Sequence, residues 1–326
     1  METLAQNRPA AGIACIVVGM ICISINDMII KQLSGDYPLH QIVMCRASIG
    51  LILTLALVQY EGGFSILRTR QPLLHLLRGL LVVASNMCFF MALAVMPLAD
   101  VTALFFVAPL FITLLSIPML GEKVGPLRIG AVVVGFIGVI IMLRPWESGD
   151  ALVANRLVLL LPLLAALTYA LLQLMTRKLG ATTKASALAC YMQAVFILVS
   201  LGFYLIAGDG RFAEGTDDPS LLFLFRAWIW PGEGDWIYLL ALGMNVAVIG
   251  YTLSQAYRLA DAATLSPFEY VGLPMAVFWG WLIWSELPDL EVWIGMILIM
   301  GAGLFVFLRE QQKSRRLARR RVNIPR

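Results

Sequence analysis

The stretch FMALAVMPLADVTALFFVAPLFITLLSIPMLGE, residues Phe90–Glu122, is repeated in outline later in the chain. Its counterpart, SQAYRLADAATLSPFEYVGLPMAVFWGWLIWSE, occupies residues Ser254–Glu286. The two align at a constant shift of 164 residues, which places Ala92 on Ala256 and the closing Glu of one copy on that of the other. In each copy an apolar helix end leads through a short turn into a second apolar helix. An internal repeat of this kind indicates a duplicated chain.

The composition is that of a membrane protein. Hydrophobic residues make up 60% of the 326 positions, charged residues only 13%, and the mean hydropathy is +0.85. A soluble domain of this length could not bury so much apolar surface. The five cysteines lie inside apolar runs without ligand-like spacing, so we interpret them as small hydrophobic residues and predict neither a metal site nor disulfides: they are Cys15, Cys22, Cys45, Cys88 and Cys190.

Ten apolar runs are long enough to cross a bilayer, five on each side of a polar break. They predict an all-α integral membrane protein with a first five-helix repeat at 10–143, an external linker at 144–156 and a second repeat at 157–308. The second repeat contains an insertion at 208–235, and a basic tail follows at 309–326. The predicted spans are Ala10–Ile30, Leu39–Tyr60, Pro72–Met96, Leu98–Leu120, Pro126–Leu143, Leu157–Thr176, Ala185–Ala207, Trp236–Leu259, Ala262–Trp284 and Leu290–Leu308.

The loop charges predict the orientation. Lysine and arginine are concentrated in the segments that share a side with the two termini, so the positive-inside rule places both termini in the cytoplasm. We expect the tail KSRRLARRR to anchor this topology and to contact membrane lipid. Because each half has an odd number of spans, the second half lies upside down relative to the first, an inverted repeat typical of secondary transporters. The insertion at 208–235 is then external, either as a lid or as a segment packed on the membrane surface.

Two helix-end segments, GEKVGPLRIGAVVVGFIGVIIML and SELPDLEVWIGMILIMGAGLFVFL, contain a turn-terminating Glu, Glu122 or Glu286, followed by a Gly-containing helix. Together with Arg46 in the second span and ten spans in inverted halves, they resemble the drug/metabolite transporter superfamily, and more narrowly its EamA-type family of bacterial inner-membrane exporters. The resemblance runs from Gly12 to about Leu308. Aromatic amino-acid exporters of this type are similar in length and topology, which implies efflux of amino acids or related metabolites by alternating access.

The second copy departs from the family pattern at two positions. Ser285 stands where the family usually has Gly. Leu273 stands where the first copy has Pro109, and the proline of the second copy comes one residue later, at Pro274.

The fourth and ninth predicted spans carry the candidate substrate site. Residues at i, i+3, i+4 and i+7 share a face of the fourth helix, and the shift of 164 maps that face onto an equivalent one in the ninth. Prolines interrupt both helices near mid-membrane, and such interruptions at matching places point to a transporter's binding site. A pair of kinked packing helices is the alternative. The predicted binding residues are Thr102, Phe105, Phe106, Ser266, Glu269 and Tyr270, with structural prolines Pro109, Pro267 and Pro274.

Glu269 is the one carboxyl deep in the second half. An ionised, unpaired carboxylate is costly in hydrocarbon, so this group must be protonated, paired or in contact with water. It could bind a substrate ammonium, carry a proton, or donate a hydrogen bond to a neighbouring helix.

Further polar groups lie inside the spans. Asp27 and Arg46, at similar depth in the first two spans, predict a buried ion pair with a structural or gating role. Four others lie near the bilayer centre and serve either as interhelical hydrogen bonds or together as a cavity wall that binds a carboxylate or amide: Asn86, Tyr169, Gln173 and Asn245.

The sequence carries no Gly-rich phosphate loop and no HExxH or G-x-S-x-G motif. We therefore expect a transporter of a small molecule, with no cofactor and no nucleic-acid partner, as a monomer or a homodimer. The predicted function is export of amino acids or related metabolites across the inner membrane. Uptake of a metabolite such as S-adenosylmethionine or a purine, and export of a lipophilic cation, are alternatives. An intramembrane enzyme or a scaffold without transport is the rival from a different class.

Overall fold

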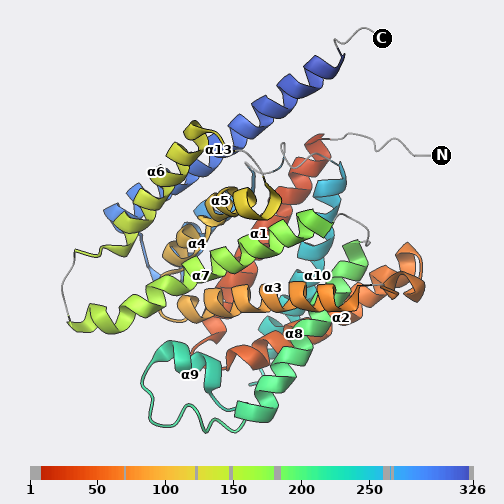
Figure 1. Cartoon of the computed structure of the whole chain (residues 1–326). Helices are drawn as coiled ribbons and strands as arrows, with labels where there is room; N and C mark the ends of the chain where they lie inside the picture. The colour runs from red at the N-terminus through yellow and green to blue at the C-terminus, as the bar shows by residue number, and fades with distance from the viewer. Residues whose placement is uncertain are drawn as a thin grey trace.

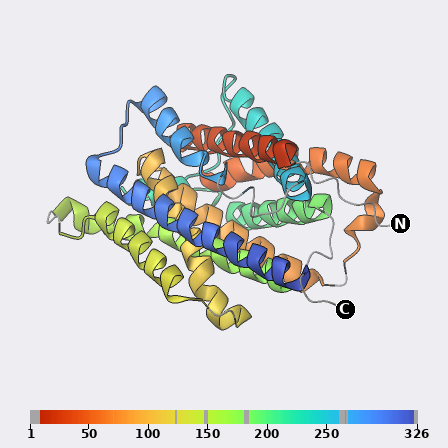
Figure 2. The same ribbon diagram turned by 90° about the horizontal axis from the view of Figure 1, so that it is seen from above.

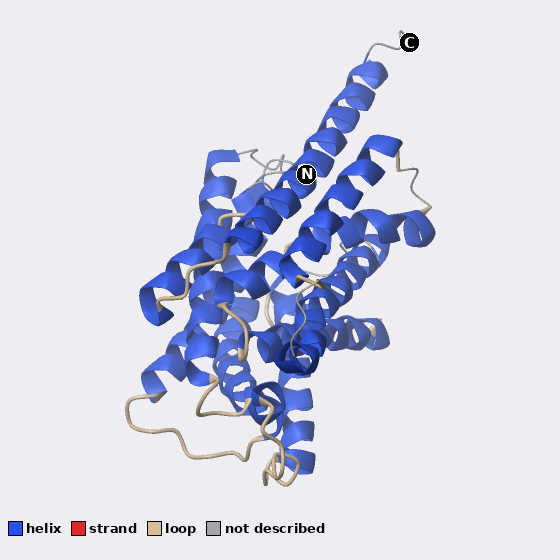
Figure 3. Cartoon of the chain, turned by 90° about the vertical axis from the view of Figure 1, so that its left-hand side faces the viewer, coloured by secondary structure: helices blue, strands red, loops and turns tan. Residues whose placement is uncertain are grey.

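The computed structural model describes residues 9–69, 71–121, 124–146, 150–179, 185–259, 265 and 268–322. Throughout this part of the chain the regular structure is helical (Figure 3), which confirms the predicted all-α class. The elements are α1 (Pro9–Leu33), α2 (Leu39–Glu61), the 3-10 helix η1 (Phe64–Leu67), α3 (Pro72–Leu93), α4 (Leu98–Phe105), α5 (Ala108–Leu120), α6 (Pro126–Leu143), α7 (Asp150–Leu179), α8 (Ala185–Ala207), α9 (Pro219–Phe225), α10 (Trp236–Leu259), α12 (Gly272–Trp284) and α13 (Leu290–Val322).

Nine segments of the described chain are long and apolar enough to cross a membrane, as expected of a multi-pass membrane protein. They coincide with nine of the ten predicted spans when α4 and α5 are taken together. The tenth predicted span contains α12, whose 13 residues are too few to cross a bilayer at about 1.5 Å per residue. Residues 260–264 and 266–267, which precede α12, lie outside the described part of the chain, so the count of ten stays a prediction.

Two helices extend beyond the predicted spans. Helix α7 begins at Asp150, inside the segment predicted as a linker, and α13 continues from its apolar part to Val322, through most of the basic tail (Figure 1). Both extensions consist mainly of Ala, Leu, Arg and similar residues, which have high helix propensity and favour continuing a helix once it has begun.

The fourth predicted span is broken. A turn at Phe106–Val107 separates α4 from α5, and Pro109 is the second residue of α5. Proline is tolerated there because the first amides of a helix have no intrahelical partner. The absent N–H of Pro109 also leaves the Phe105 carbonyl without its usual i+4 donor.

The second half breaks at the matching place. Helix α12 has the bounds of α5 shifted by 164 residues, and both helices contain 13 residues. The turn before α12, at Tyr270–Val271, corresponds to the turn at Phe106–Val107. The following helices, α6 and α13, begin at Pro126 and Leu290, again 164 residues apart.

The ends of α5 and α12 also correspond. Gly121 and Ser285 both adopt a left-handed backbone, with φ of 68° and 56°. Their amides bond to the carbonyls of Ile117 and Trp281, which are themselves equivalent positions. Glycine takes this conformation without steric cost. Ser285 therefore keeps the helix end that a glycine would provide, in spite of its side chain.

The helices pack in pairs that correspond between the halves. Helix α1 packs against α10 as α3 packs against α7, while α2 pairs with α8 and α6 with α13. In the α6–α13 pair, Gly138 and Gly295 bring the two backbones together: a Cβ on either glycine would lie within 3.0 Å of the other's carbonyl oxygen. These two glycines therefore allow close packing between two helices of the same chain.

The molecule has two distinct ends. The start of α1 and the end of α13 lie on the same side in Figures 1 and 2, and we call this side the tail end. Segment 208–235, which contains α9, lies on the opposite side together with the turn between α1 and α2 (Figure 1), and we call this side the loop end.

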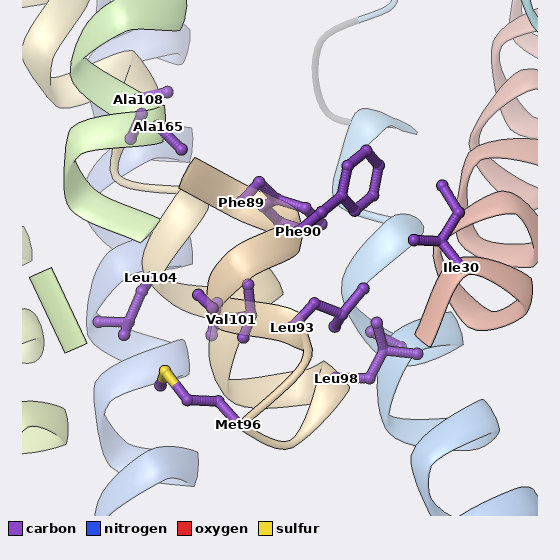
Figure 4. Packing of buried hydrophobic residues seen from close by; sticks show 14 of the residues in the cluster. Ile30, Phe89, Phe90, Leu93, Met96, Leu98, Val101, Leu104, Ala108 and Ala165 are labelled. Atoms are coloured by element: carbon purple, nitrogen blue, oxygen red, sulfur yellow. The ribbon is translucent and has the colours of Figure 1, made fainter. Parts of the chain in front are cut away.

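The apolar core is centred on α3 and α4. Figure 4 shows Phe89, Phe90 and Leu93 of α3 and Val101 and Leu104 of α4 in this core, with Ile30 of α1 and Ala165 of α7 nearby. All of these side chains are more than nine-tenths buried. The core fixes α3 and α4 in place, and α3 in turn supplies a wall of the cavity described next.

Candidate functional site

A cavity of about 270 Å³ lies between α1, α2, α3, α8 and α10, and we call it the main cavity. It extends from Asp27 and Arg46, toward the loop end, to Glu61 at the tail-end terminus of α2 and Gln255 in the last turns of α10. Its walls combine apolar side chains with convergent polar ones, the usual character of a small-molecule site. The polar side chains are Asn26, Asp27, Arg46, Thr54, Glu61, Asn86, Ser186, Gln193, Tyr251 and Gln255.

Arg46 lies between two aromatic rings. Its guanidinium carbon is 5.3 Å from the ring centroids of both Phe90 and Phe196. Nη1 donates to Asn26 Oδ1 at 3.5 Å, and Nη2 donates to Asn86 Oδ1 at 3.3 Å. A guanidinium has about five N–H donors, so two long hydrogen bonds leave donors available to an acceptor in the cavity. The stacked rings restrict the guanidinium to one plane and pre-orient those donors.

The direct ion pair predicted between Asp27 and Arg46 is not formed among the described side chains, and Asn26 lies between them instead. Asn26 accepts from Arg46 through Oδ1 and donates from Nδ2 to Asp27 Oδ1 at 3.2 Å. Consecutive residues of a helix point about 100° apart, so Asn26, not Asp27, faces the guanidinium. Two opposite charges therefore line one cavity without direct contact.

The faces predicted on the fourth and ninth spans meet in part. The rings of Phe106 and Tyr270, equivalent positions of the two halves, lie 5.2 Å apart between centroids. Phe105 packs against Phe89 and Tyr169, each at 5.4 Å. The Thr102 hydroxyl donates to the Leu98 carbonyl within α4 at 2.7 Å. These contacts are those of a packed aromatic layer.

Glu269 is partly buried and directly precedes Tyr270. Ser266 and Pro267 lie outside the described part of the chain, and Pro274 is the third residue of α12. The described wall of the main cavity contains none of Thr102, Phe105, Phe106, Glu269 and Tyr270. Their role in substrate binding stays a prediction.

The other predicted polar groups differ in position: one lines the main cavity, and the others form hydrogen bonds within or between helices. Asn86 lines the main cavity and contacts Arg46. Asn245 of α10 donates to the Cys22 carbonyl of α1 at 2.6 Å and joins these helices. Gln173 donates to the Tyr169 hydroxyl at 2.7 Å within α7.

Sequence reasoning missed several residues of the cavity. Asn26, Gln193 and Gln255 are uncharged, and Phe90 and Phe196 are aromatics within apolar helices, where such residues usually form core. The sequence could have pointed to these residues only if the packing of α2 against α3 and α8 had been known, because they lie on different helices from Arg46 and come near it only through that packing.

At the loop end, segment 208–235 is bonded to the rest of the protein. The Tyr37 hydroxyl donates to Asp235 Oδ2 at 2.6 Å and accepts from the Gly232 amide at 3.0 Å. The Gln41 side chain donates to the Ile229 carbonyl at 2.6 Å and accepts from the Ile229 amide at 3.3 Å. These contacts join the segment to the turn between α1 and α2 and to the start of α2.

A second set of contacts closes the same end. Lys31 Nζ bonds to Glu286 Oε2 at 2.7 Å and to the Met96 carbonyl at 3.2 Å, and lies 4.7 Å from the centroid of the Trp284 ring. Lys31 lies in the last turn of α1, whereas Glu286 follows α12, so this ion pair joins the first half of the chain to the second.

Comparison with known proteins identifies the family. Residues 10–144 match the EamA-like transporter family. A riboflavin transporter from Brucella anthropi is 31% identical over 267 residues, which cover 82% of this chain and 87% of the relative. The chain belongs to the EamA-like transporter family. This agrees with the resemblance to the drug/metabolite transporter superfamily inferred from the helix-end segments.

Other relatives are transporters with different named substrates. An S-adenosylmethionine uptake transporter from Rickettsia prowazekii is 27% identical over 301 residues, covering 92% of this chain and 94% of the relative. The pseudopaline exporter CntI from Pseudomonas aeruginosa is 26% identical over 294 residues, covering 90% and 94%. A crystal structure shares the fold of this EamA-like chain, with a TM-score of 0.61 at 19% identity, and covers 92% of this chain and 98% of the other. This EamA-like protein is accordingly a transporter of small metabolites.

Proposed function

We propose that this protein is a secondary transporter of the inner membrane that exports amino acids or related metabolites carrying an amino-acid group, by alternating access. The observation that carries the proposal is the pair of opposite charges, Asp27 and Arg46, on the wall of one cavity without direct contact.

An amino-acid group carries a carboxylate and an ammonium about one carbon apart. A guanidinium can bind the carboxylate through two parallel N–H bonds, and a carboxylate side chain complements the ammonium. The amides of Asn26 and Asn86, already oriented by Arg46, supply further donors and acceptors beside the two charges. Such a site recognises a zwitterion better than it recognises an anion, a cation or a neutral molecule.

The architecture that we propose is ten spans in two inverted halves, with both termini in the cytoplasm. It is supported by the break before α5 and the break before α12, which are 164 residues apart, and by the contact between Phe106 and Tyr270. The basic tail and the position of segment 208–235 at the opposite end of the molecule support the orientation. The main cavity then reaches toward the cytoplasm, and the loop end is the outer, closed end.

Within this proposal the predicted faces of the fourth and ninth spans belong to the inner wall of the transport path. Thr102, Phe105, Phe106, Ser266, Glu269 and Tyr270 would contact the substrate once the halves have moved. Pro109, Pro267 and Pro274 would place the helix breaks, and Tyr169, Gln173 and Asn245 would border the same path.

A second candidate is uptake of S-adenosylmethionine, favoured by the Rickettsia prowazekii relative, which aligns with 92% of this chain. S-adenosylmethionine carries an amino-acid group, so the same charge pair would bind it, and only the direction of transport differs. A lipophilic cation is the weaker choice, because the Arg46 charge in the cavity would repel it.

The test is exchange by the purified protein in liposomes, with labelled L-phenylalanine, S-adenosylmethionine and riboflavin as probes. We expect saturable exchange of at least one of the two zwitterions at ten times the riboflavin rate or more. Exchange of riboflavin without either zwitterion would refute the proposed substrate class. Comparison of inverted with right-side-out membrane vesicles, with and without a pH gradient, then gives direction and coupling.

The orientation has its own test. A periplasmic reporter fused after Gly215 should be active, and a cytoplasmic reporter fused after Lys313 should be active. The reverse pattern would overturn the proposed topology.

A further inference from the structure

A second, smaller cavity of about 20 Å³ lies beyond the main cavity, and we call it the outer chamber. The two cavities share Asn86, Phe90 and Phe196 as wall residues, so these side chains form the partition between them. Arg46 lies between the two partition rings. On its other side the outer chamber is bounded by His40 and by Leu224 of α9. It therefore lies between the charge pair and the segment that closes the loop end.

His40 is buried, with 4% of its surface exposed, and lines the outer chamber. Its Nδ1 lies 3.0 Å from the Leu224 carbonyl oxygen. A carbonyl can only accept a hydrogen bond, so Nδ1 carries the proton and Nε2 of the neutral ring is an acceptor. Nε2 is buried and has no hydrogen-bond partner in the described part of the chain.

A buried acceptor without a donor destabilises the folded protein, so an unsatisfied Nε2 calls for an explanation. The ring packs near Phe203 and Trp228, at 5.9 and 5.8 Å between centroids. The ring packing and the bond from Nδ1 to the Leu224 carbonyl give His40 a structural role, but neither of them uses Nε2. The outer chamber has room for about one water molecule, which is too little for a metabolite while the partition is closed.

We propose that the outer chamber is the outer part of the transport path and that His40 Nε2 accepts a hydrogen bond from the ammonium or another N–H or O–H group of the substrate in transit. This inference rests on the proposed function, because it takes the main cavity as the binding site. When the Phe90–Arg46–Phe196 partition opens, the substrate passes from the charge pair into the widened chamber. His40 there replaces one of the bonds that the substrate gives up.

Two substitutions at His40 separate hydrogen bonding to the substrate from a purely structural role. Each substitution keeps the function of one ring nitrogen and removes or weakens that of the other. In His40→Gln the amide oxygen can reach the place of Nε2, so the acceptor is kept and the bond to Leu224 is weakened. In His40→Asn the amide nitrogen takes the place of Nδ1, so the bond to Leu224 is kept and the acceptor is lost.

The measurement is exchange of labelled L-phenylalanine and S-adenosylmethionine in liposomes, with equilibrium binding of the same probes in detergent. We expect His40→Gln to keep at least half of the maximal rate and His40→Asn to lose at least five-fold, with binding to the main cavity changed less than two-fold in both. The opposite order, or equal rates of the two variants, would overturn the inference and assign His40 a packing role.

If His40→Gln does not fold, Ser200→Cys in a chain without the five native cysteines gives the answer. Ser200 lines the outer chamber. Modification of this cysteine by a small thiol reagent during exchange should stop transport, and the reaction should be faster with substrate present than without it. A cysteine that never reacts, or that reacts without effect on transport, refutes the path. A wild-type protein that moves neither probe refutes the proposed function itself, together with this inference.

Discussion

The loop end and the main cavity differ in how their polar side chains are bonded. At the loop end, Tyr37 both donates to Asp235 and accepts from Gly232, and Lys31 bonds to Glu286 at 2.7 Å. In the main cavity, Arg46 makes two long hydrogen bonds to described side chains, at 3.3 and 3.5 Å, and no ion pair with Asp27 within the described part of the chain.

Polar groups that satisfy one another close a structure, whereas groups that keep spare donors and acceptors beside a cavity are available to a ligand. This difference supports the proposal that the loop end is closed and that the main cavity binds the substrate. Three substitutions test it, and a fourth, at Glu269, tests the faces predicted on the fourth and ninth spans; they follow in order of expected effect.

Arg46→Gln should have the largest effect. It removes the charge while keeping a polar side chain between Phe90 and Phe196, and it leaves a substrate carboxylate without its partner. Loss of one member of a buried charge pair costs about 2–5 kcal/mol, so exchange of L-phenylalanine should fall about 100-fold or more. The matched control is Arg211→Gln, on the exposed part of segment 208–235. This variant should exchange L-phenylalanine at the wild-type rate. Normal exchange by Arg46→Gln would remove the cavity from the binding role.

Asp27→Asn should raise the KM for zwitterions about 10-fold or more, because a hydrogen bond to a charged group contributes about 1.5–3 kcal/mol. The control is a second substrate that lacks the ammonium group. For 3-phenylpropionate, the KM values of wild type and variant should differ less than three-fold. Equal KM changes for both compounds would mean that Asp27 supports the cavity without binding the ammonium.

Glu269→Gln should lower transport about ten-fold if the carboxyl binds an ammonium or moves a proton. If the group only donates a hydrogen bond, transport should stay nearly unchanged, because glutamine is nearly isosteric and also donates. Glu233→Gln, an exposed change in segment 208–235, is the control. Loss of transport that persists when the pH is equal on both sides favours substrate binding over proton coupling.

Tyr37→Phe should have the smallest effect on transport, less than about three-fold, because it acts on closure and leaves the binding residues intact. It removes the hydroxyl shared by Asp235 and Gly232, and about 1 kcal/mol of stabilisation with it. Hydrogen exchange at the amides of 229–235 should become about five-fold faster. Tyr238→Phe, at a partly exposed ring, is the control. Unchanged exchange at these amides would show that other contacts hold the segment.

The sequence predicted the helices well where the signal is local. Each of the ten predicted spans begins or ends within about three residues of the boundary of a described helix, since a long apolar run or a proline acts on its own neighbourhood. The break at Phe106–Val107 follows from Pro109. The left-handed Ser285 was not predictable from its own residue type, because serine rarely takes that conformation, although its equivalence to Gly121 pointed to it.

The site was harder to predict than the helices. Asp27 and Arg46 were expected to pair because they lie at similar depth, but depth does not fix the direction in which a side chain leaves its helix. That direction put Asn26 between them. Phe90 and Phe196 belong to apolar helices, and their contact with Arg46 of α2 follows only from the packing of α3 and α8 in the folded chain.

By itself the sequence determined that this chain is a helical membrane protein, because hydropathy and proline positions are properties of single segments, and its helix-end segments carried the resemblance to the EamA-like family. The tertiary structure decided which polar side chains share a cavity, which rings enclose Arg46, and which contacts close the loop end. The physical reason is that these properties depend on the rotation of each helix about its own axis and on the neighbour it packs against, and no single segment carries that information.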